Sequence, residues 1–369
     1  MTNKSNGRNA SIILIVLLIL AVFFGWLGYE PGTLFNAYAR GLAFTFLGAG
    51  LVIFFIDILA RRRQDYLVQY LEEQRRMQED VQLARETQLM KAQLMREIGS
   101  GDPGLAARAI KDLDEHGWLT DGTLADSHLA AANLEGANLG WVNLNGAFLN
   151  RINLRDAELN YANFSRANLG SAVLTRANLD LANLTEADLR GADMSLCSLN
   201  EADLSGAIIE GAVLSGASLV DANMNKVKAE RVALNGANLE RANLSESNLS
   251  HADMERANLA GANMGWTILT RANLEKADLS EANLSGANLE DARLNGANLT
   301  GTFLFGAQVT LKVLSTARSL ANATMPDGTK YEDWVRRQSA EQPQPNGQTT
   351  TAEQASGTPS DYVAQSETS

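Results

Sequence analysis

Few residues of this 369-residue chain have the type and spacing that chemistry at a site requires. Cys197 is the only cysteine, and it stands where an internal repeat otherwise has alanine, so we expect a small buried side chain that forms no disulfide within the chain. His116, His128 and His251 are scattered and show no metal-binding spacing. Phosphate-cradling glycine loops, nucleophile elbows and paired catalytic carboxylates are missing. We therefore predict a protein that is no enzyme and binds no cofactor or metal.

A repeat of five residues, from about Leu124 to Leu304, must position most side chains of the molecule. Every fifth residue is large and apolar, and the series runs without a slip in register. The residue two places earlier is nearly always alanine, and asparagine or aspartate stands between them, as in Ala132-Asn133-Leu134. Such a repeat is sought before elements are assigned, because missing it misassigns the whole fold.

A period of five fits neither regular secondary structure. In an α-helix a step of five advances about 140° around the axis and would scatter the leucines over every face. In a strand it moves each leucine to the opposite face. The chain must therefore turn once per pentad, so that alanine and leucine both point into a narrow, filled tube. Glycine is frequent at the expected corners, as at Gly136, Gly146, Gly191, Gly206, Gly216 and Gly236.

The pattern resembles that of the pentapeptide-repeat family, whose motif Ala-Asn/Asp-Leu-X-X covers roughly half of the chain. The resemblance implies a mainly β fold, a right-handed quadrilateral β-helix with four pentads in each coil. The four sides come from the family, since the period alone does not give them. At a strand spacing of about 4.8 Å, residues 120–310 would form about nine coils and a rod on the order of 45 Å long.

Two observations favour a coil of twenty residues. Aspartates at the middle position of the pentad, such as Asp188 and Asp203, never fall on one another at a spacing of twenty. Corner charges twenty residues apart are opposite more often than alike, although Glu201/Asp221 and Glu255/Glu275 are like pairs. The opposite pairs are Glu135/Arg155, Arg166/Glu186, Asp156/Arg176, Arg190/Glu210, Asp221/Arg241, Lys226/Glu246 and Arg271/Asp291.

The first sixty residues are different in kind from the rest. Apolar runs cover 12–24 and 34–60, separated by a Pro-Gly turn, and each can provide the roughly 20 residues that cross a bilayer. The alternative for the first run is a cleaved signal peptide, but no small-residue cleavage site follows it. We predict a two-span transmembrane hairpin in residues 1–63 that contacts the lipid bilayer through residues 12–60.

Basic residues predict the orientation of the hairpin. Lys4 and Arg8 precede the first run, three arginines at 61–63 follow the second, and the loop between the runs holds little charge. The positive-inside rule then gives a multi-pass protein of the cell membrane with both termini and the repeat domain in the cytoplasm. Asp57 lies four residues before Arg61, so we interpret it as a paired interfacial carboxylate and not as a proton relay.

Residues 64–100 are predicted to form a helical stalk, because they are charged, mixed in sign and free of proline. A weak coiled-coil seam would form a homo-oligomer, and a single solvated helix is the alternative. The apolar residues on one heptad frame are Leu67, Tyr70, Met77, Val81, Ala84, Met95 and Ile98, with Gln74, Gln88 and Lys91 at the other positions of the frame.

A rod of stacked coils exposes its terminal leucines and requires caps. Residues 101–119 are predicted to cap the first coil with a short helix, begun by Asp102 and Pro103 and ended by Gly117 in a Schellman-type turn. Its expected apolar face is Leu105, Ala109 and Leu113.

At the other end, residues 311–338 are expected to form the C-terminal cap. Residues 339–369 are rich in Gln, Pro, Thr, Ser and Gly, hold no packing residues, and are predicted to be disordered.

One outward feature breaks the polar pattern of the corners. Trp141, Tyr161 and Leu181 occupy the same corner in three successive coils and form what we call the apolar stripe. Two interpretations stay open: the N-terminal cap helix or the stalk packs on the stripe, or the stripe docks a protein partner.

These features favour a membrane-anchored cytoplasmic scaffold that mediates protein–protein interaction with a partner whose identity the sequence does not give. The alternative comes from the resemblance, since some acidic pentapeptide-repeat proteins resemble duplex DNA and bind type II topoisomerases. The net charge is −12. Against mimicry, bases alternate with acids along each side, so we expect no continuous acidic face. Direct nucleic-acid binding is not expected of a negatively charged rod. Transport by the hairpin is a still weaker hypothesis, because two spans with one interfacial carboxylate line no pathway unless many copies assemble.

Overall fold

The computed structural model describes residues 3–27 and 34–341, and the chain divides into two compact units, Met1–Met90 and Lys91–Ser369. The structure assigns five helices to the described residues. They are α1 (Asn3–Leu27), α2 (Leu34–Ile98), α3 (Pro103–Glu115), α4 (Leu311–Leu314) and α5 (Tyr331–Glu341). The expected tail from residue 342 onward lies outside the described residues, and α5 includes its first three positions.

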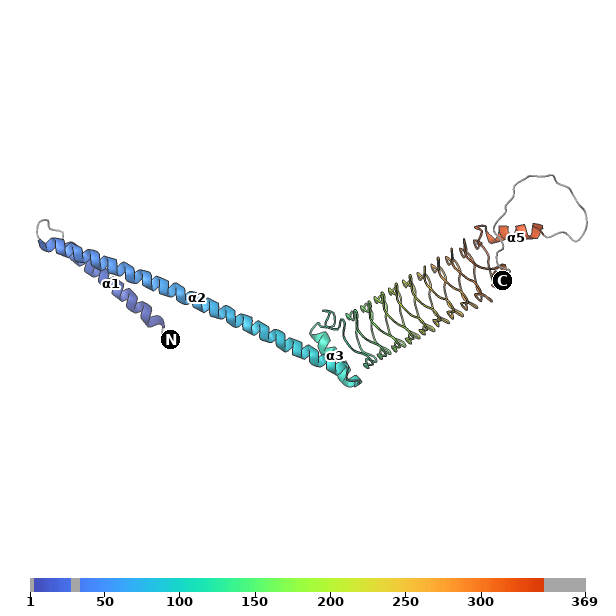
Figure 1. Ribbon diagram of the computed structural model, residues 1–369, viewed down its shortest axis with the longest axis horizontal. Helices are drawn as coiled ribbons and strands as arrows, with labels where there is room; N and C mark the ends of the chain where they lie inside the picture. The colour runs from blue at the N-terminus through green and yellow to red at the C-terminus, as the bar shows by residue number, and fades with distance from the viewer. Residues whose placement is uncertain (1–2, 28–33, 342–369) are drawn as a thin grey trace, which may run out of the picture. The chain divides into compact units, whose positions relative to one another are not determined.

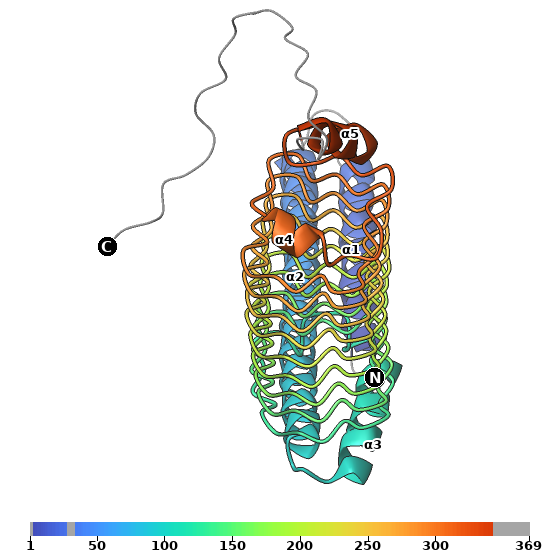
Figure 2. The ribbon, with the colours of Figure 1, turned by 90° about the vertical axis from the view of Figure 1, so that its right-hand side faces the viewer.

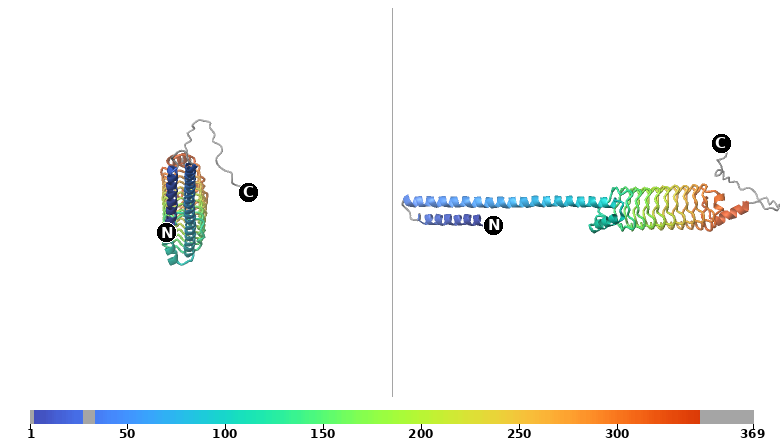
Figure 3. Two further views of the ribbon diagram at one scale, coloured as in Figure 1. Left: turned by 90° about the vertical axis from the view of Figure 1, so that its left-hand side faces the viewer. Right: turned by 90° about the horizontal axis from the view of Figure 1, so that it is seen from below.

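In the first unit, α1 lies alongside the first part of α2 (Figure 3). Small residues make this contact: Ala21 of α1 and Ala39 and Ala43 of α2 are buried, while most of their large neighbours are exposed. A side-chain carbon added at Gly50 of α2 would lie 3.5 Å from Leu14 Cδ1 of α1. Close approach through small residues is how helices associate in lipid, where apolar burial alone supplies no driving force.

The prediction of two spans is met in part. One described helix, Ala37–Ile98, is long and apolar enough to cross a membrane, whereas the apolar stretch found in α1, Ile12–Phe23, is shorter than a span. The reason is visible in the sequence, because the first nine residues of α1 are mostly polar. The predicted ion pair forms, with Arg61 Nη2 2.7 Å from Asp57 Oδ2.

The second unit contains a stack of coils (Figures 1 and 2), and the bridges between coils repeat every twenty residues. Parallel bridges join the middle residue of each pentad to the residue twenty positions later, from His128–Phe148 to Asn288–Gln308. The twenty-residue coil is therefore confirmed. The prediction of a mainly β fold is met in part, because the described coils are joined by parallel bridges that stay isolated and form no longer strand. The chain turns after each short side, so only the middle residue of the pentad bridges to its neighbours.

Backbone hydrogen bonds explain the pentad. The Asn153 amide donates to Ala132 O at 2.9 Å, and the Leu134 amide donates to Asn153 O at 2.7 Å, so each coil is bonded to the next. The corner is a turn in which the Ala137 amide donates to Leu134 O at 3.1 Å. The residue before the alanine position has a φ near +60° at almost every corner, whether it is glycine or not. Non-glycine residues pay about 1 kcal/mol for this conformation.

The interior is a column of alanine and leucine positions, which are buried throughout the coils as predicted. Ser247, Thr267 and Thr302 stand at alanine positions and are also buried. Their hydroxyls donate to backbone carbonyls at 2.6, 3.0 and 2.8 Å, respectively. A buried hydroxyl costs little when it is bonded in this way. The tube is therefore filled, and its center has no room for a ligand.

The first coil is covered by α3 together with the last turns of α2. Asp102 Oδ1 accepts from the Gly104 and Leu105 amides, and the Trp118 amide donates to Leu113 O at 2.8 Å, which is the predicted Schellman bond. The buried face of α3 comprises Ala106, Ala109, Ile110 and Leu113. The predicted face was wrong at Leu105, which is exposed.

The last turns of α2 belong to the same core. Leu94 and Ile98 are buried in it. Lys91 Nζ lies 2.8 Å from Asp121 Oδ2, 2.7 Å from Thr123 Oγ1, and over the ring of Trp118. Lys91 therefore fixes the end of α2 to the first turn of the coils. Lys91 and Ile98 take part in this cap, so they are not free to join a coiled-coil seam.

At the C-terminal end the spacing changes by one residue. Asn298 bridges Ser319 and Phe303 bridges Thr324, twenty-one positions away. The short helix α4 lies between these partners in sequence, and Thr310 caps it by accepting from the Val313 amide. Met325 is buried, and Tyr331 and Trp334 of α5 pack against the core. The regular register therefore stops where apolar groups from α4 and α5 close the stack.

Candidate functional site

The structure brings the three residues of the predicted apolar stripe together. The rings of Trp141 and Tyr161 stack with their centroids 4.1 Å apart and their planes 4° apart. Trp141 is 61% exposed, Tyr161 42% and Leu181 40%. All three have φ near +60°, so the corner backbone points each side chain outward in the same way in successive coils. The stripe is a rigid surface, because every coil beneath it is bonded to its neighbours.

A pocket of about 440 Å³ adjoins the stripe at Trp141. Its carboxylates are Asp114, from the last turn of α3, and Glu158, from a coil side. Sequence reasoning missed these two residues, because Asp114 reaches the site only through the packing of α3. The remaining lining residues are Leu119, Asn138, Gly140 and Asn160.

The corner that carries the stripe is also acidic. At this corner and on the two coil sides next to it, from Asn138 to Phe303, eight carboxylates and one base occur. We call these carboxylates the acidic edge: Glu158, Asp180, Glu201, Asp203, Asp221, Glu240, Asp278 and Glu281. The one base, Arg241, binds Asp221 and Glu240.

This arrangement corrects the expectation that acids and bases alternate along every side. They do alternate elsewhere, and five of the seven predicted stacked ion pairs form. Of the other two, Arg155 lies beside Asp156 and Arg190 binds Asp188. Reading each corner together with its two neighbouring sides would have found the edge from the sequence.

Several carboxylates of the coils are held in the charged form. The hydrogen bond from Arg190 lowers the pKa of Asp188 below its ordinary value. Burial raises the pKa of Asp278, but hydrogen bonds from Ser280 and Asn298 outweigh it, and the pKa is lowered. At the cap, burial likewise raises the pKa of Asp121, and hydrogen bonds from Lys91 and Thr123 lower it further than burial raises it.

The residues with catalytic potential do not form a reactive site. Burial raises the pKa of the Cys197 thiol to about 12, so the thiol stays protonated. His116 stacks on Trp118 and His128 on Phe148. No group of His, Cys, Asp and Glu that could hold a metal ion occurs in the described ranges 3–27 and 34–341.

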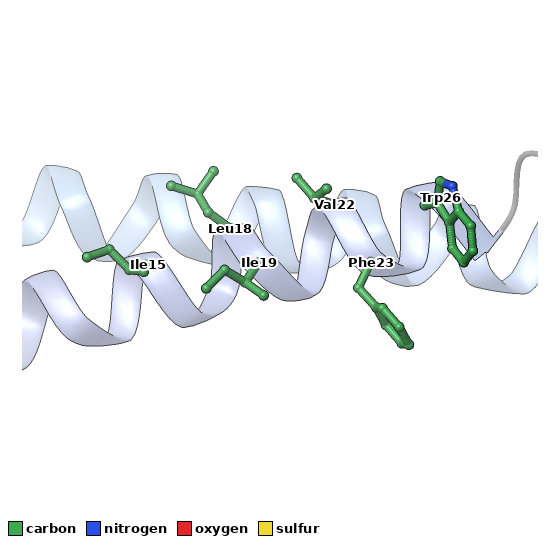
Figure 4. A pocket seen from close by; sticks show the side chains of 6 residues that line it. All are labelled: Ile15, Leu18, Ile19, Val22, Phe23 and Trp26. Carbon is green, nitrogen blue, oxygen red and sulfur yellow. The ribbon is translucent and has the colours of Figure 1, made fainter.

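Other apolar surfaces of the described residues include a groove on α1 and a second exposed tryptophan in the coils. A shallow groove of about 520 Å³ on α1 is lined by apolar side chains (Figure 4), as expected of a surface that faces acyl chains. It is formed by Ile15, Leu18, Ile19, Val22, Phe23 and Trp26. In the coils, Trp266 is 72% exposed at a different corner, and its ring covers Gly286, where an added Cβ would lie 2.7 Å from Trp266 Cε3.

The fold and this surface define a class of protein: a solenoid of five-residue repeats that is capped at both ends. Eight copies of the pentapeptide repeats model match residues 132–169, 162–200, 197–236, 237–275 and 272–307. The chain belongs to the pentapeptide repeat family, and its coil is the right-handed β-helix of that family. No curated protein matches the chain.

Solved structures similar to this chain include HetL, a pentapeptide repeat protein involved in heterocyst differentiation regulation from the cyanobacterium Nostoc sp. strain PCC 7120. The identity is 30%, the match covers 60% of this chain and 98% of HetL, and the TM-score is 0.26. QnrB1, a plasmid-mediated fluoroquinolone resistance protein, is 18% identical over 58% of this chain and 97% of its own, with a TM-score of 0.28. A pentapeptide repeat protein from the Arabidopsis thaliana thylakoid lumen is 28% identical over 35% and 72%, with a TM-score of 0.18.

Proposed function

We propose that the protein is a membrane-anchored scaffold that presents a rigid surface to a protein partner in the cytoplasm. In this proposal, residues 1–63 hold the protein in the cell membrane, 64–100 act as a spacer, and 120–310 form the presenting rod between the caps 101–119 and 311–338. The apolar stripe carries the proposal, because Trp141, Tyr161 and Leu181 are exposed at one corner of three successive coils and the rings of Trp141 and Tyr161 stack 4.1 Å apart. Exposed aromatic side chains on a rigid base are typical of interaction surfaces.

The anchor rests on the helices of the first unit. Large apolar residues of α1 and of the first half of α2 are exposed, and in water this would be costly. In lipid the same exposure is favourable, and the helix Ala37–Ile98 meets the length and composition of a span. The arginines at 61–63 support a cytoplasmic position for the chain that follows.

We also propose that the exposed part of the stalk can associate with a second copy. Leu67, Met77 and Val81 of α2 are exposed, which leaves a seam for a partner helix. The seam is shorter than the heptad pattern indicates, because Ile98 and Lys91 are used by the cap.

Proximity labelling on intact membranes tests the scaffold. A biotin ligase is fused to the full chain, and its neighbours are compared with those of a triple variant, Trp141→Ala, Tyr161→Ala and Leu181→Ala. We expect the triple variant to lose a small set of neighbours and to keep its membrane level. Trp266→Ala, which removes an exposed indole from a different corner, is the matched control and should keep the full set. An unchanged set of neighbours in the folded triple variant would contradict the proposal.

Membrane topology is tested separately. Because Cys197 is buried and protonated, single cysteines introduced by Gly32→Cys and Ser369→Cys can be labelled on a low background. We expect a membrane-impermeant maleimide added to intact cells to label the first variant and not the second. Labelling of Ser369→Cys from outside would place the repeat domain on the other side of the membrane.

The acidic edge favours one alternative function, a DNA-mimicking rod that binds a type II topoisomerase. Duplex DNA carries one charge per about 1.7 Å of its axis, whereas the edge carries about one carboxylate per coil of about 4.8 Å. The density of charge is therefore about threefold too low for close mimicry. A gyrase supercoiling assay with the full chain in nanodiscs distinguishes the two functions, and inhibition at stoichiometric amounts would favour the mimic.

A further inference from the structure

We propose that the pocket beside Trp141 binds the guanidinium group of an arginine in a basic segment of the partner protein, and that this segment continues along the apolar stripe and the acidic edge. The inference rests on the proposed scaffold function and names the chemistry of its partner. It assigns a ligand class to a site that combines residues from α3 and from two coils.

The walls of the pocket fit a planar cation. Trp141 lines the pocket and is held flat by its stack on Tyr161. An arginine side chain stacks on an aromatic ring through its planar guanidinium while its hydrogen atoms point outward to acceptors. Asp114 and Glu158 supply carboxylates at the rim, and the side chains of Asn138 and Asn160 add amide oxygens.

The carboxylates of the pocket have no basic partner among the residues that the structure describes. Glu158 Oε2 accepts a hydrogen bond from the neutral amide of Asn178 at 2.9 Å, and no ion pair of the described chain includes Glu158 or Asp114. A bound cation would therefore meet two negative charges that no resident cation neutralises.

The end of α3 strengthens the same argument. Its last turn contains Asp112, Asp114 and Glu115 and no basic residue, so negative side chains stand at the negative end of the helix dipole. Lys111 Nζ lies 3.7 Å from Glu115 Oε1, so this lysine neutralises the charge of Glu115 and not the charges of the two aspartates. A cation that bound here would interact favourably with the helix end as well as with the pocket.

The surface beyond the pocket indicates which residues should follow the arginine in the partner's basic segment. After Leu181, the same corner continues with Glu201 and then Asp221, and Asp180 lies beside it. A partner that places an arginine in the pocket would therefore follow it with apolar side chains over the stripe and basic ones over the edge. The occupant is not the C-terminal part of the chain after residue 341, because that part has Glu353, Asp361 and Glu367 and no lysine or arginine.

The test uses the full chain in phosphatidylcholine nanodiscs, because anionic lipid would itself bind a basic probe. The probe is a fluorescein-labelled peptide of twelve residues with three arginines and three leucines, and the comparison peptide has neutral citrulline in place of each arginine. Fluorescence anisotropy reports binding. We expect the arginine peptide to bind and the citrulline peptide to bind at least about tenfold more weakly, since hydrogen bonds between charged groups dominate such sites.

Variants locate the binding to the pocket. Glu158→Gln keeps the shape of the side chain and removes its charge, and Trp141→Ala removes the stacking surface. We expect each to weaken binding of the arginine peptide by about tenfold or more, which is an ordinary effect for a central contact. Glu255→Gln and Trp266→Ala change the same residue types at other corners and should leave binding within about twofold. Circular dichroism checks that each variant is folded, and the isosteric glutamine keeps the test valid if the tryptophan variant unfolds.

Equal affinity for the two peptides, or binding that Glu158→Gln does not change, would overturn the inference. Self-association that Trp141→Ala abolishes, together with no peptide binding, would assign the stripe to a second copy of the chain and also overturn it. The scaffold function is judged apart from this, because proximity labelling of the triple variant does not depend on the peptide. A changed set of neighbours without peptide binding would reject the arginine site and keep the scaffold.

Discussion

Leucine serves opposite purposes in the two units of this protein. In α2, Leu51 and Leu59 are exposed by more than half. In the coils, leucines such as Leu199 and Leu234 are completely buried. The two regions have similar apolar side chains, so composition does not distinguish them. The spacing does: an apolar run predicts a helix with an apolar surface on every side, and a leucine at every fifth position predicts a tube with an apolar interior.

This difference indicates where each region obtains its stability. The coils carry their own apolar surroundings, so their folding depends on the packing of alanine and leucine in the column. The helices of the first unit bury few apolar side chains in the described residues, and most of their large apolar side chains are exposed. Variants that remove the same atoms should therefore have unequal effects in the two regions.

The largest difference is expected from a pair of leucine truncations. Leu234→Ala leaves a cavity in the filled column and should lower the free energy of unfolding of the coils by about 2–5 kcal/mol. Leu51→Ala removes an exposed side chain from α2 and should change that free energy by less than about 0.5 kcal/mol. Denaturant unfolding of the full chain in nanodiscs, followed by circular dichroism, measures both. Equal losses would mean that the two regions unfold as one.

The second largest effect is expected from acidification, which should destabilise the coils and their C-terminal cap. The pKa values of Asp188, Asp193, Asp278 and Asp327 are lowered by hydrogen bonds that the folded state makes to their charged forms. A carboxyl whose pKa is lower in the folded state than in the unfolded state stabilises the fold at a pH above its ordinary pKa of about 4. This stability is lost as the pH falls through the pKa of the folded state. We expect a constant melting temperature between pH 7 and 5 and a decrease below about pH 4. A melting temperature that rises at low pH would contradict the sign.

A smaller effect is expected where α2 enters the second unit. Lys91→Ala removes the bonds to Asp121 and Thr123 and the contact with Trp118, and should destabilise the first coil by about 1 kcal/mol. Lys111→Ala, on the exposed face of α3, is the control and should have little effect. Hydrogen exchange of the first two coils reports the change locally. Equal protection in both variants would mean that Lys91 does not fasten the helix.

The smallest effect is expected at the surface of the coils. Arg241→Ala removes exposed ion pairs with Asp221 and Glu240 and should change stability very little, since water and salt screen such pairs. The same change leaves the acidic edge without its one base. Binding of the arginine peptide should therefore rise slightly while stability stays almost constant. A large loss of stability would show that the corner charges support the fold.

The sequence predicts the coils well because each position repeats many times. The inward alanine and leucine and the pair Asp57–Arg61 depend on local rules, and the structure confirms both. The coil of twenty residues comes from the resemblance to the family and is supported by the stacking of charges. The apolar stripe could be placed for the same reason, since Trp141, Tyr161 and Leu181 share one register.

What could not be predicted depends on contacts between different elements. Leu105 is not on the buried face of α3, because that face is selected by the shape of the first coil. The sequence of the helix alone does not give that shape. The heptad pattern places Lys91 in a coiled-coil seam, whereas in the structure its ammonium group donates a hydrogen bond to Asp121, thirty residues later. The pocket was missed because Asp114 and Glu158 meet only when the cap is in place.

The change of spacing at Ser319 and Thr324 has a consequence for how copies of the chain meet. A bare last coil would offer unpaired backbone groups in the right pattern for the first coil of another molecule, and such ends grow into filaments. Here the extra residue puts the final bridges out of step, and α4 and α5 cover the remaining apolar groups. The two caps should therefore block head-to-tail polymerisation, even where many copies of the chain lie close together.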